Sequence, residues 1–261
     1  MNNSHLTPEK LLGDNVFPPE WSEVQVAFVC FTPFPNGFKP YEVKIAQDRY
    51  FLHSPNSEVH LCRFQGIPFI VISEVYGFAV GATTVEELVH YGVKTIIAVG
   101  YAGAFNNAPV GQPFIAVDTM SDLPLAAHYG ISEYVHSQPS GELLKVLDTC
   151  IREDTNQWGH FTVWTSNSLY RESPQIVQHM KDHGCDVVNM DTLSIYAVTP
   201  VCAADAKRKV EFIYVGTVTD SKQEKDEDWH SDLVEAVKRE TAHPHDHLVT
   251  FLVETFLPGL D

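Results

Sequence analysis

The stretch GATTVEELVHYGVKTIIAVGYAG, residues 81–103, carries the most structural information in this chain of 261 residues. Within it, Thr83 to Tyr91 has the apolar spacing of an amphipathic helix. Thr95 to Val99 is a short apolar run bounded by turn residues, which predicts a buried strand. The following Gly100-Tyr101-Ala102-Gly103 predicts a loop after that strand, where ligands collect in open α/β sheets. A plain strand-to-loop turn is the alternative interpretation.

The same alternation extends to both sides of this stretch. Further apolar runs predict strands at Val24–Phe31, Pro68–Ile72, Pro113–Val117, Gly159–Trp164 and Val210–Val215. Helical spacing is found at Gly141–Glu153, Pro174–His183, Met190–Thr199 and His245–Leu257. Alternating strands and helices favour an α/β fold with a buried sheet covered by helices. Without repeats or a low-complexity linker, we expect one domain over residues 1–261, with residues 1–20 as a peripheral N-terminal segment.

Composition excludes several classes of protein. The chain is 44% hydrophobic and 20% charged, as globular proteins are. Its 34 acidic against 17 basic residues give a formal charge of −17, so we expect neither nucleic acid nor a membrane as partner. The five cysteines form no C-x-x-C pair, and their odd number does not suggest a disulfide framework. The N-terminus has no basic region followed by an apolar stretch, and we expect a cytoplasmic protein.

Five segments, in order, resemble the nucleoside phosphorylase and nucleosidase family, which includes hexameric purine nucleoside phosphorylases, uridine phosphorylases and methylthioadenosine nucleosidases. Residues 81–103 are similar to the family's helix, strand and glycine loop, and Val110–Asp118 to its VGDIVIATD strand. The other three segments are similar to short motifs of the family: Thr165–Tyr170 to SADxFY, Val188–Asp191 to VEME, and Val218–Asp220 to VSD. The resemblance implies a single domain with a mixed central β-sheet flanked by helices. It also implies a small-molecule nucleoside as ligand and a homo-oligomer, such as a dimer or trimer of dimers, with sites at subunit contacts.

The family reaction breaks the bond between a ribose and a nucleobase, so it needs an acid near the departing base. Asp220 matches this acid and favours a purine, with Thr219 beside it, whereas starting a turn or capping a helix is the alternative use of Asp220. Leu169 and Tyr170 match the aromatic pair of SADxFY, of which the first residue stacks on the base. Leu169 at that position still provides an apolar contact but has no aromatic ring. By the same resemblance, substrate binding is assigned to three residues of the glycine loop: Tyr101, Ala102 and Gly103.

A second carboxylate near the ribose has to hold its hydroxyls and offset the positive charge of the sugar. Asp191 matches this residue but is one methylene shorter than the family's Glu, and Met190 matches the Met that packs against the sugar. Asn189 replaces the first Glu of VEME by an uncharged amide. Tyr76 stands in the loop that borders the ribose, or is a core or rim aromatic. Capping of the helix that runs to Thr199 is the alternative role of Asn189 and Asp191.

The residues that bind phosphate in the phosphorylases have no counterpart here. The family's GDPxR loop reads FTPFPNGFK, Phe31–Lys39, and the Arg and Ser of RVGS are replaced by Ala98 and Tyr101. We expect the bulky Tyr101 to fill the vacated phosphate volume. The first-strand loop also lacks the Glu by which nucleosidases activate water, which leaves Glu74 as the candidate catalytic base. A solvent-facing or ion-paired Glu is the alternative role of Glu74.

We therefore expect cleavage of the N-glycosidic bond of a purine-type nucleoside, by phosphorolysis or hydrolysis. No cofactor and no metal are expected, and phosphate is the co-substrate of the phosphorolytic alternative. A non-catalytic nucleoside-binding or storage protein, or a pocket used for another small molecule, remain the alternatives. In His243–His247 a solvated helix N-terminus is favoured over a zinc site. The acidic run Glu224–Asp228 predicts a segment that covers the site or a solvated loop.

Overall fold

The computed structural model describes residues 5–13, 17–221, 230–231 and 244–260. The described strands are β1 (Val26–Cys30), β2 (Glu42–Ile45), β3 (Val59–Phe64), β4 (Ile67–Ile72), β5 (Thr95–Ala104), β6 (Pro113–Met120), β7 (Gly159–Thr165), β8 (Val187–Asn189), β9 (Glu211–Ser221) and β10 (His230–Ser231). The α-helices are α1 (Pro8–Leu12), α2 (Gly77–Tyr91), α3 (Gly141–Cys150), α4 (Pro174–Asp182), α5 (Thr192–Tyr196), α6 (Val198–Asp205) and α8 (Pro244–Phe251). No helix among these residues is long and apolar enough to cross a membrane.

All the described strands join one mixed sheet in the order β10-β9-β6-β7-β8-β5-β1-β4-β3-β2. Strand β1 runs parallel to both of its neighbours, β4 and β5, whereas β3 and β2 continue the sheet in antiparallel pairs. Strand β9 pairs with β6 and also runs parallel to β5, so β5, β8, β7, β6 and β9 form a closed circuit. The predicted mixed central sheet is confirmed, and the circuit places the end of β8 between β5 and the end of β7.

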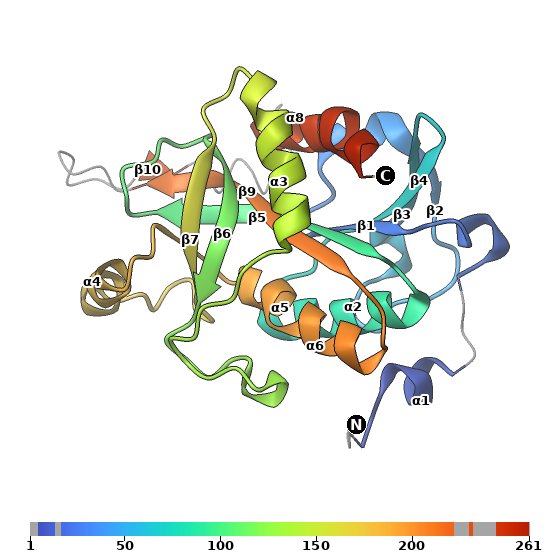
Figure 1. Ribbon diagram of the computed structural model, residues 1–261, viewed down its shortest axis with the longest axis horizontal. Helices are drawn as coiled ribbons and strands as arrows, with labels where there is room; N and C mark the ends of the chain where they lie inside the picture. The colour runs from blue at the N-terminus through green and yellow to red at the C-terminus, as the bar shows by residue number, and fades with distance from the viewer. Residues whose placement is uncertain (1–4, 14–16, 222–229, 232–243, 261) are drawn as a thin grey trace.

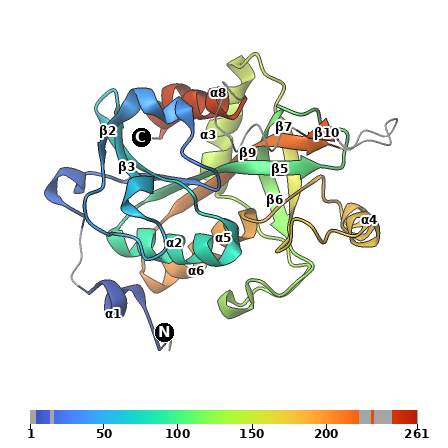
Figure 2. The ribbon, with the colours of Figure 1, turned by 180° about the vertical axis from the view of Figure 1, so that it is seen from behind.

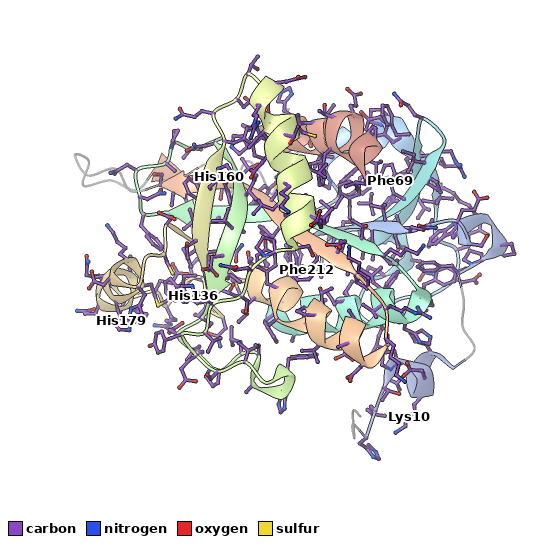
Figure 3. The ribbon with its side chains drawn as sticks, viewed as in Figure 1. Lys10, Phe69, His136, His160, His179 and Phe212 are labelled. Carbon is purple, nitrogen blue, oxygen red and sulfur yellow. The ribbon has the colours of Figure 1, made fainter. Side chains whose placement is uncertain are left out.

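Helices cover the sheet on both faces (Figure 1): α2, α5 and α6 lie on one side, α3 and α8 on the other. Seen from behind, α4 stands at the far end of the molecule, near β6 and β7 (Figure 2). Each face has its own buried apolar cluster, with Phe212 on the α2 side and Phe69 on the α8 side, both labelled in Figure 3. In β5, Ala98 and Ala102 face α2, whereas Ile97 and Val99 face α8.

The prediction of a loop at Gly100–Gly103 is wrong, because β5 continues to Ala104 and pairs with β9 throughout. These glycines permit close packing rather than a turn. A Cβ at Gly100 would overlap the Tyr214 hydroxyl, and one at Gly103 would lie 2.6 Å from Asp220 Oδ2. The two glycines therefore make room for polar side chains of β9.

Several other elements differ from the sequence prediction. The helix expected over Met190–Thr199 begins at Thr192 and divides into α5 and α6. The helix expected over His245–Leu257 is α8, which passes into a π-helical turn, Leu252–Phe256. Strands β2, β3 and β8 were not predicted. Polar residues interrupt the apolar residues of β2 and β3, and β8 has only three residues.

Candidate functional site

Most of the candidate residues lie near the ends of strands of the closed circuit, whereas Glu74 and Tyr76 follow β4. Ala102 and Gly103 lie close to the end of β5. Asn189 is the last residue of β8, and Asp220 is the penultimate residue of β9. Asp220 was predicted to follow its strand and instead lies within it. Ligand sites in α/β proteins commonly form at strand ends, where side chains from several strands converge.

Asn189 organises the first of two polar clusters. Its side-chain oxygen accepts hydrogen bonds from the backbone N–H groups of Asp191 (3.1 Å) and Thr192 (3.3 Å). Its Nδ2 donates to the Thr192 hydroxyl at 2.8 Å. These bonds satisfy backbone donors at the start of α5, so Asn189 has the capping role that was its alternative interpretation.

Asp191 is buried, with 7% of its surface exposed. Its Oδ1 accepts a hydrogen bond of 3.2 Å from the backbone N–H of Gly77, the first residue of α2. Burial raises the pKa of Asp191 to about 8, and the Gly77 hydrogen bond opposes that shift. At neutral pH the carboxyl group is therefore mostly protonated and can donate as well as accept. We call Gly77, Asn189 and Asp191 the Asp191 cluster.

Two predicted neighbours of this cluster lie next to it in the chain. Tyr76 immediately precedes α2 and is about half exposed, and Met190 is half-buried between Asn189 and Asp191. Glu74 is exposed, and its backbone has a φ of 57°, a conformation that costs free energy for a residue other than glycine. Its N–H donates to the Thr32 carbonyl at 2.8 Å. The structure thus ties Glu74 to the loop after β1.

Asp220 forms the second cluster at a β-bulge. The β5–β9 register moves from Ala102 opposite Val218 to Gly103 opposite Asp220, which leaves Thr219 as the extra residue. Bulges re-aim side chains, and here the Asp220 carboxylate lies over Gly103. The Thr219 hydroxyl donates to Asp220 Oδ1 at 3.2 Å. Gly103 contributes to this cluster by having no side chain.

Glu172 is a neighbour of Asp220 that the sequence motifs did not indicate. Burial, together with the neighbouring Asp220 and Asp122 carboxylates, raises the pKa of Glu172 to about 7, and a hydrogen bond with Ser166 opposes the shift. Asp122 in turn accepts a hydrogen bond of 2.7 Å from the Trp164 indole. We call Gly103, Asp122, Glu172 and Asp220 the Asp220 cluster. Its members come from four segments, so no local sequence signal identifies it.

Tyr101 lies on the α8 side of the sheet. It lies on the opposite face of β5 from Ala98, and its ring packs edge-on against His245 of α8, with centroids 4.7 Å apart. It therefore does not fill the volume beside Ala98. His245 itself is buried, and its Nδ1 lies 3.1 Å from the Thr217 hydroxyl. A solvated helix N-terminus was thus the wrong prediction for His245, whereas His243 lies outside the described residues.

Leu169 and Tyr170 follow β7 and lie at the surface, with 48% and 90% of their area exposed. The acidic run Glu224–Asp228, predicted to lie over the site or in solvent, falls outside the described residues.

Two other features bear on the location of a site. A surface groove lined by Pro174, Gln175, Gln178, His179 and Asp182 runs along α4, whose His179 is labelled in Figure 3. It contains none of the predicted site residues and belongs to one exposed helix. In the described part of the chain, no group of three or more His, Cys, Asp or Glu side chains is arranged to hold a metal ion.

Solved structures with a similar fold include a phosphorylase and a nucleosidase. Uridine phosphorylase from Vibrio fischeri superimposes with a TM-score of 0.69 at 19% identity, covering 90% of this chain and 91% of that one. The 5'-methylthioadenosine/S-adenosyl homocysteine nucleosidase of Campylobacter jejuni gives a TM-score of 0.63 at 16% identity, covering 88% of this chain and 97% of that one. At such identities the likeness concerns the fold.

Sequence comparison gives the family. An uncharacterized protein of Acanthamoeba polyphaga mimivirus is 34% identical over 244 residues, which cover 91% of both chains. Residues 76–253 match the family model of the Phosphorylase superfamily. This match includes Tyr76, the Asp191 cluster and the Asp220 cluster, and it confirms the resemblance drawn from the motifs. The chain belongs to the Phosphorylase superfamily.

Proposed function

We propose that this protein cleaves the N-glycosidic bond of a purine-type nucleoside. Membership of the superfamily supports the reaction class. The observation that carries the proposal is the presence of two carboxyl groups in unlike surroundings, Asp191 buried against the start of α2 and Asp220 half-buried over Gly103. Cleavage develops positive charge on the sugar and negative charge on the base, so it requires groups with different roles at its two ends.

At the base, Asp220 and Glu172 form the acid. Glu172 holds a proton near neutral pH because it is partly buried beside Asp220 and Asp122. Two neighbouring carboxyl groups with one proton between them supply a donor for the departing base at the pH where the protein works. A purine is proposed because its N7 accepts such a proton, and Leu169 provides apolar contact with the ring.

At the sugar, the protonated Asp191 has the capacity to donate to one ribose hydroxyl and accept from another, whereas offsetting the positive charge of the sugar requires its ionised form. Met190 packs against the sugar and Tyr76 borders it in this proposal. Because Asp191 is shorter than glutamate and already bonded to Gly77, the ribose must approach the start of α2 closely or bind through a water molecule.

We propose water rather than phosphate as the acceptor. Phosphate recognition requires Arg, Lys or several convergent N–H donors. Beside Ala98 the structure instead has the rings of Phe31 and Tyr214, whose centroids are 6.0 Å apart. Glu74, exposed and hydrogen-bonded through its backbone to the loop after β1, is the proposed base for this water.

A chromatographic assay of a nucleoside panel, with and without phosphate, tests the function. Equal release of free base in both buffers is expected for a nucleosidase, and release only with phosphate would replace water by phosphate as acceptor. If no nucleoside is cleaved but calorimetry detects binding, the protein is a nucleoside-binding protein. The absence of both the phosphate arginine and a first-strand glutamate favours that second candidate.

We also propose that the working form is a homo-oligomer. The exposed side chains of Leu169 and Tyr170 next to the site support this, because such apolar area is usually covered by a partner. Light scattering of the purified protein is expected to give a multiple of 29.2 kDa. A mass of one chain at micromolar concentration contradicts the proposal.

A further inference from the structure

The connection between β4 and α2, residues 73–76, carries the proposed base Glu74 and leads into the Asp191 cluster. Glu74 has a φ of 57°, in the left-handed region that residues with a side chain rarely adopt. Such a backbone costs free energy and persists only where the surrounding contacts impose it. The contacts of this connection therefore indicate what keeps Glu74 in place.

The end of β1 holds the connection from one side. The Glu74 N–H donates to the Thr32 carbonyl at 2.8 Å. The next N–H, that of Val75, donates at 3.1 Å to the carbonyl of Cys30, the last residue of β1. Val75 is fully buried, whereas Glu74 is exposed. These two bonds fix the backbone around Glu74 while its side chain stays at the surface.

Glu58, the residue before β3, holds the connection from the other side. Ser73 is fully buried, and its N–H donates to the Glu58 carbonyl at 2.9 Å, which continues the β3–β4 ladder by one step. The Ser73 hydroxyl also donates to Glu58 Oε2 at 2.5 Å. A hydrogen bond of this length to a carboxylate is charge-assisted and stronger than one between neutral groups. The ladder does not require this second bond, which adds a constraint directly before Glu74.

We propose that Glu58 and Ser73 are positioning residues that act through Glu74. Their side-chain bond ties the residue before Glu74 to β3, while β1 holds Glu74 and the residue after it. The left-handed backbone is thus imposed from two strands, and the Glu74 carboxylate is kept at the site. The inference rests on the proposed function in so far as Glu74 is the base for water. Glu58 and Ser73 precede residues 76–253, which the family model matches.

Ser73→Ala tests the bond without any turnover, because it removes the hydroxyl and keeps the backbone. Hydrogen exchange of the Glu74 and Val75 amides is expected to become about tenfold faster, since local opening no longer breaks the bond to Glu58. Ser140→Ala is the matched control: the Ser140 hydroxyl accepts the Phe212 N–H at 2.9 Å before α3, and its loss should leave these two amides protected. Unchanged exchange of both amides in folded Ser73→Ala would overturn the proposal.

Glu58 variants test whether the acceptor itself is responsible. Glu58→Gln keeps an oxygen that accepts the Ser73 hydroxyl and should largely retain the protection, whereas Glu58→Leu should lose it. Equal loss of protection in both variants would contradict the role of the hydrogen bond.

A double-mutant cycle with Glu74→Gln separates positioning from stability. Ser73→Ala is expected to lower kcat about tenfold at nearly constant KM, because a misplaced base slows the chemical step without removing a contact to the nucleoside. Added to Glu74→Gln, the same change should leave kcat where it was. Equal losses in both backgrounds would show that Ser73 acts on stability alone and would overturn the proposal. Unchanged turnover in Glu74→Gln itself would remove Glu74 from the mechanism, a failure of the proposed function that the exchange measurement distinguishes from a failure of the bond.

Discussion

The Asp191 cluster and the Asp220 cluster are built from carboxyl groups in opposite ways. Asp191 is a single acid, buried and held by a backbone N–H at the start of a helix. Asp220 is half-buried and shares its surroundings with Glu172 and Asp122. Burial alone raises the pKa of Asp191, whereas both burial and neighbouring carboxylates raise the pKa of Glu172. The fold thus keeps protons on two acids near neutral pH by different means, and each means can be removed separately.

The largest effect is expected from Asp220→Asn. The amide keeps the shape of the side chain but cannot deliver a proton, so base release should fall by about 100-fold or more. Circular dichroism and the melting temperature should match the wild type, because the residue is only half-buried near the end of β9. Unchanged turnover on every accepted nucleoside would leave Asp220 with a structural role only.

How much of the two clusters can be predicted from the sequence depends on how far apart in the sequence the interacting residues are. Asp191 and Asp220 were found because each lies in a motif at a strand end, which is a local feature. The side of β5 on which Tyr101 lies was missed because the glycines predicted a loop at Gly100–Gly103, whereas β5 continues and its side chains alternate between the two faces. Glu172 was missed because its neighbours come from separate segments, and the match of Gly100 to Tyr214 joins two strands more than a hundred residues apart.

Asp191→Asn isolates the effect of burial. The folded state keeps this carboxyl protonated up to about pH 8, whereas the unfolded chain releases the proton near 3.8. The unfolded state therefore binds fewer protons in this range, and stability falls as pH rises, by up to about 1.4 kcal/mol per pH unit. The Asn variant still accepts the Gly77 N–H and does not titrate. Urea unfolding at pH 5, 6.5 and 8 should give a variant whose stability relative to wild type increases with pH.

This comparison of wild type and variant cancels the contributions of other acids to the pH dependence. A difference in stability that stays constant from pH 5 to pH 8 would mean that Asp191 is ionised in the folded protein. In that case the sugar side would offer only an acceptor.

Glu172→Gln tests the contribution of neighbouring carboxylates, with a smaller expected effect. The Glu172 carboxyl ionises at about pH 7, so wild-type kcat/KM should decline several-fold as the pH rises from 6 to 8. The amide cannot titrate, and this decline should disappear in the variant. Glu153→Gln, an exposed residue after α3, is the control and should keep the wild-type profile. A decline that persists in Glu172→Gln would assign the titration to another group.

The smallest effect is the one expected from phosphate, which should change nothing. The dianion requires cationic or N–H partners, and a chain of net charge −17 provides no general attraction in their place. Ala98 faces Tyr214 across the β5–β9 pair, and Tyr101 packs on the other side of the sheet. Among the basic residues, Arg63 donates to the Gly66 carbonyl in its own hairpin at 2.8 Å, and Lys39 is exposed.

A ligand stabilises the folded state only in proportion to its occupancy, so low millimolar phosphate should leave the melting temperature and the rate of base release unchanged. Chloride at equal ionic strength is the control, because salt alone also changes the stability of a strongly acidic protein. A saturable rise in melting temperature with phosphate, accompanied by faster base release, would contradict hydrolysis and make Lys39→Ala the next variant to examine. Faster release without any thermal shift would instead indicate phosphate bound only together with the nucleoside, and the same rate assay on Tyr214→Phe would then reveal whether the space beside Ala98 receives it.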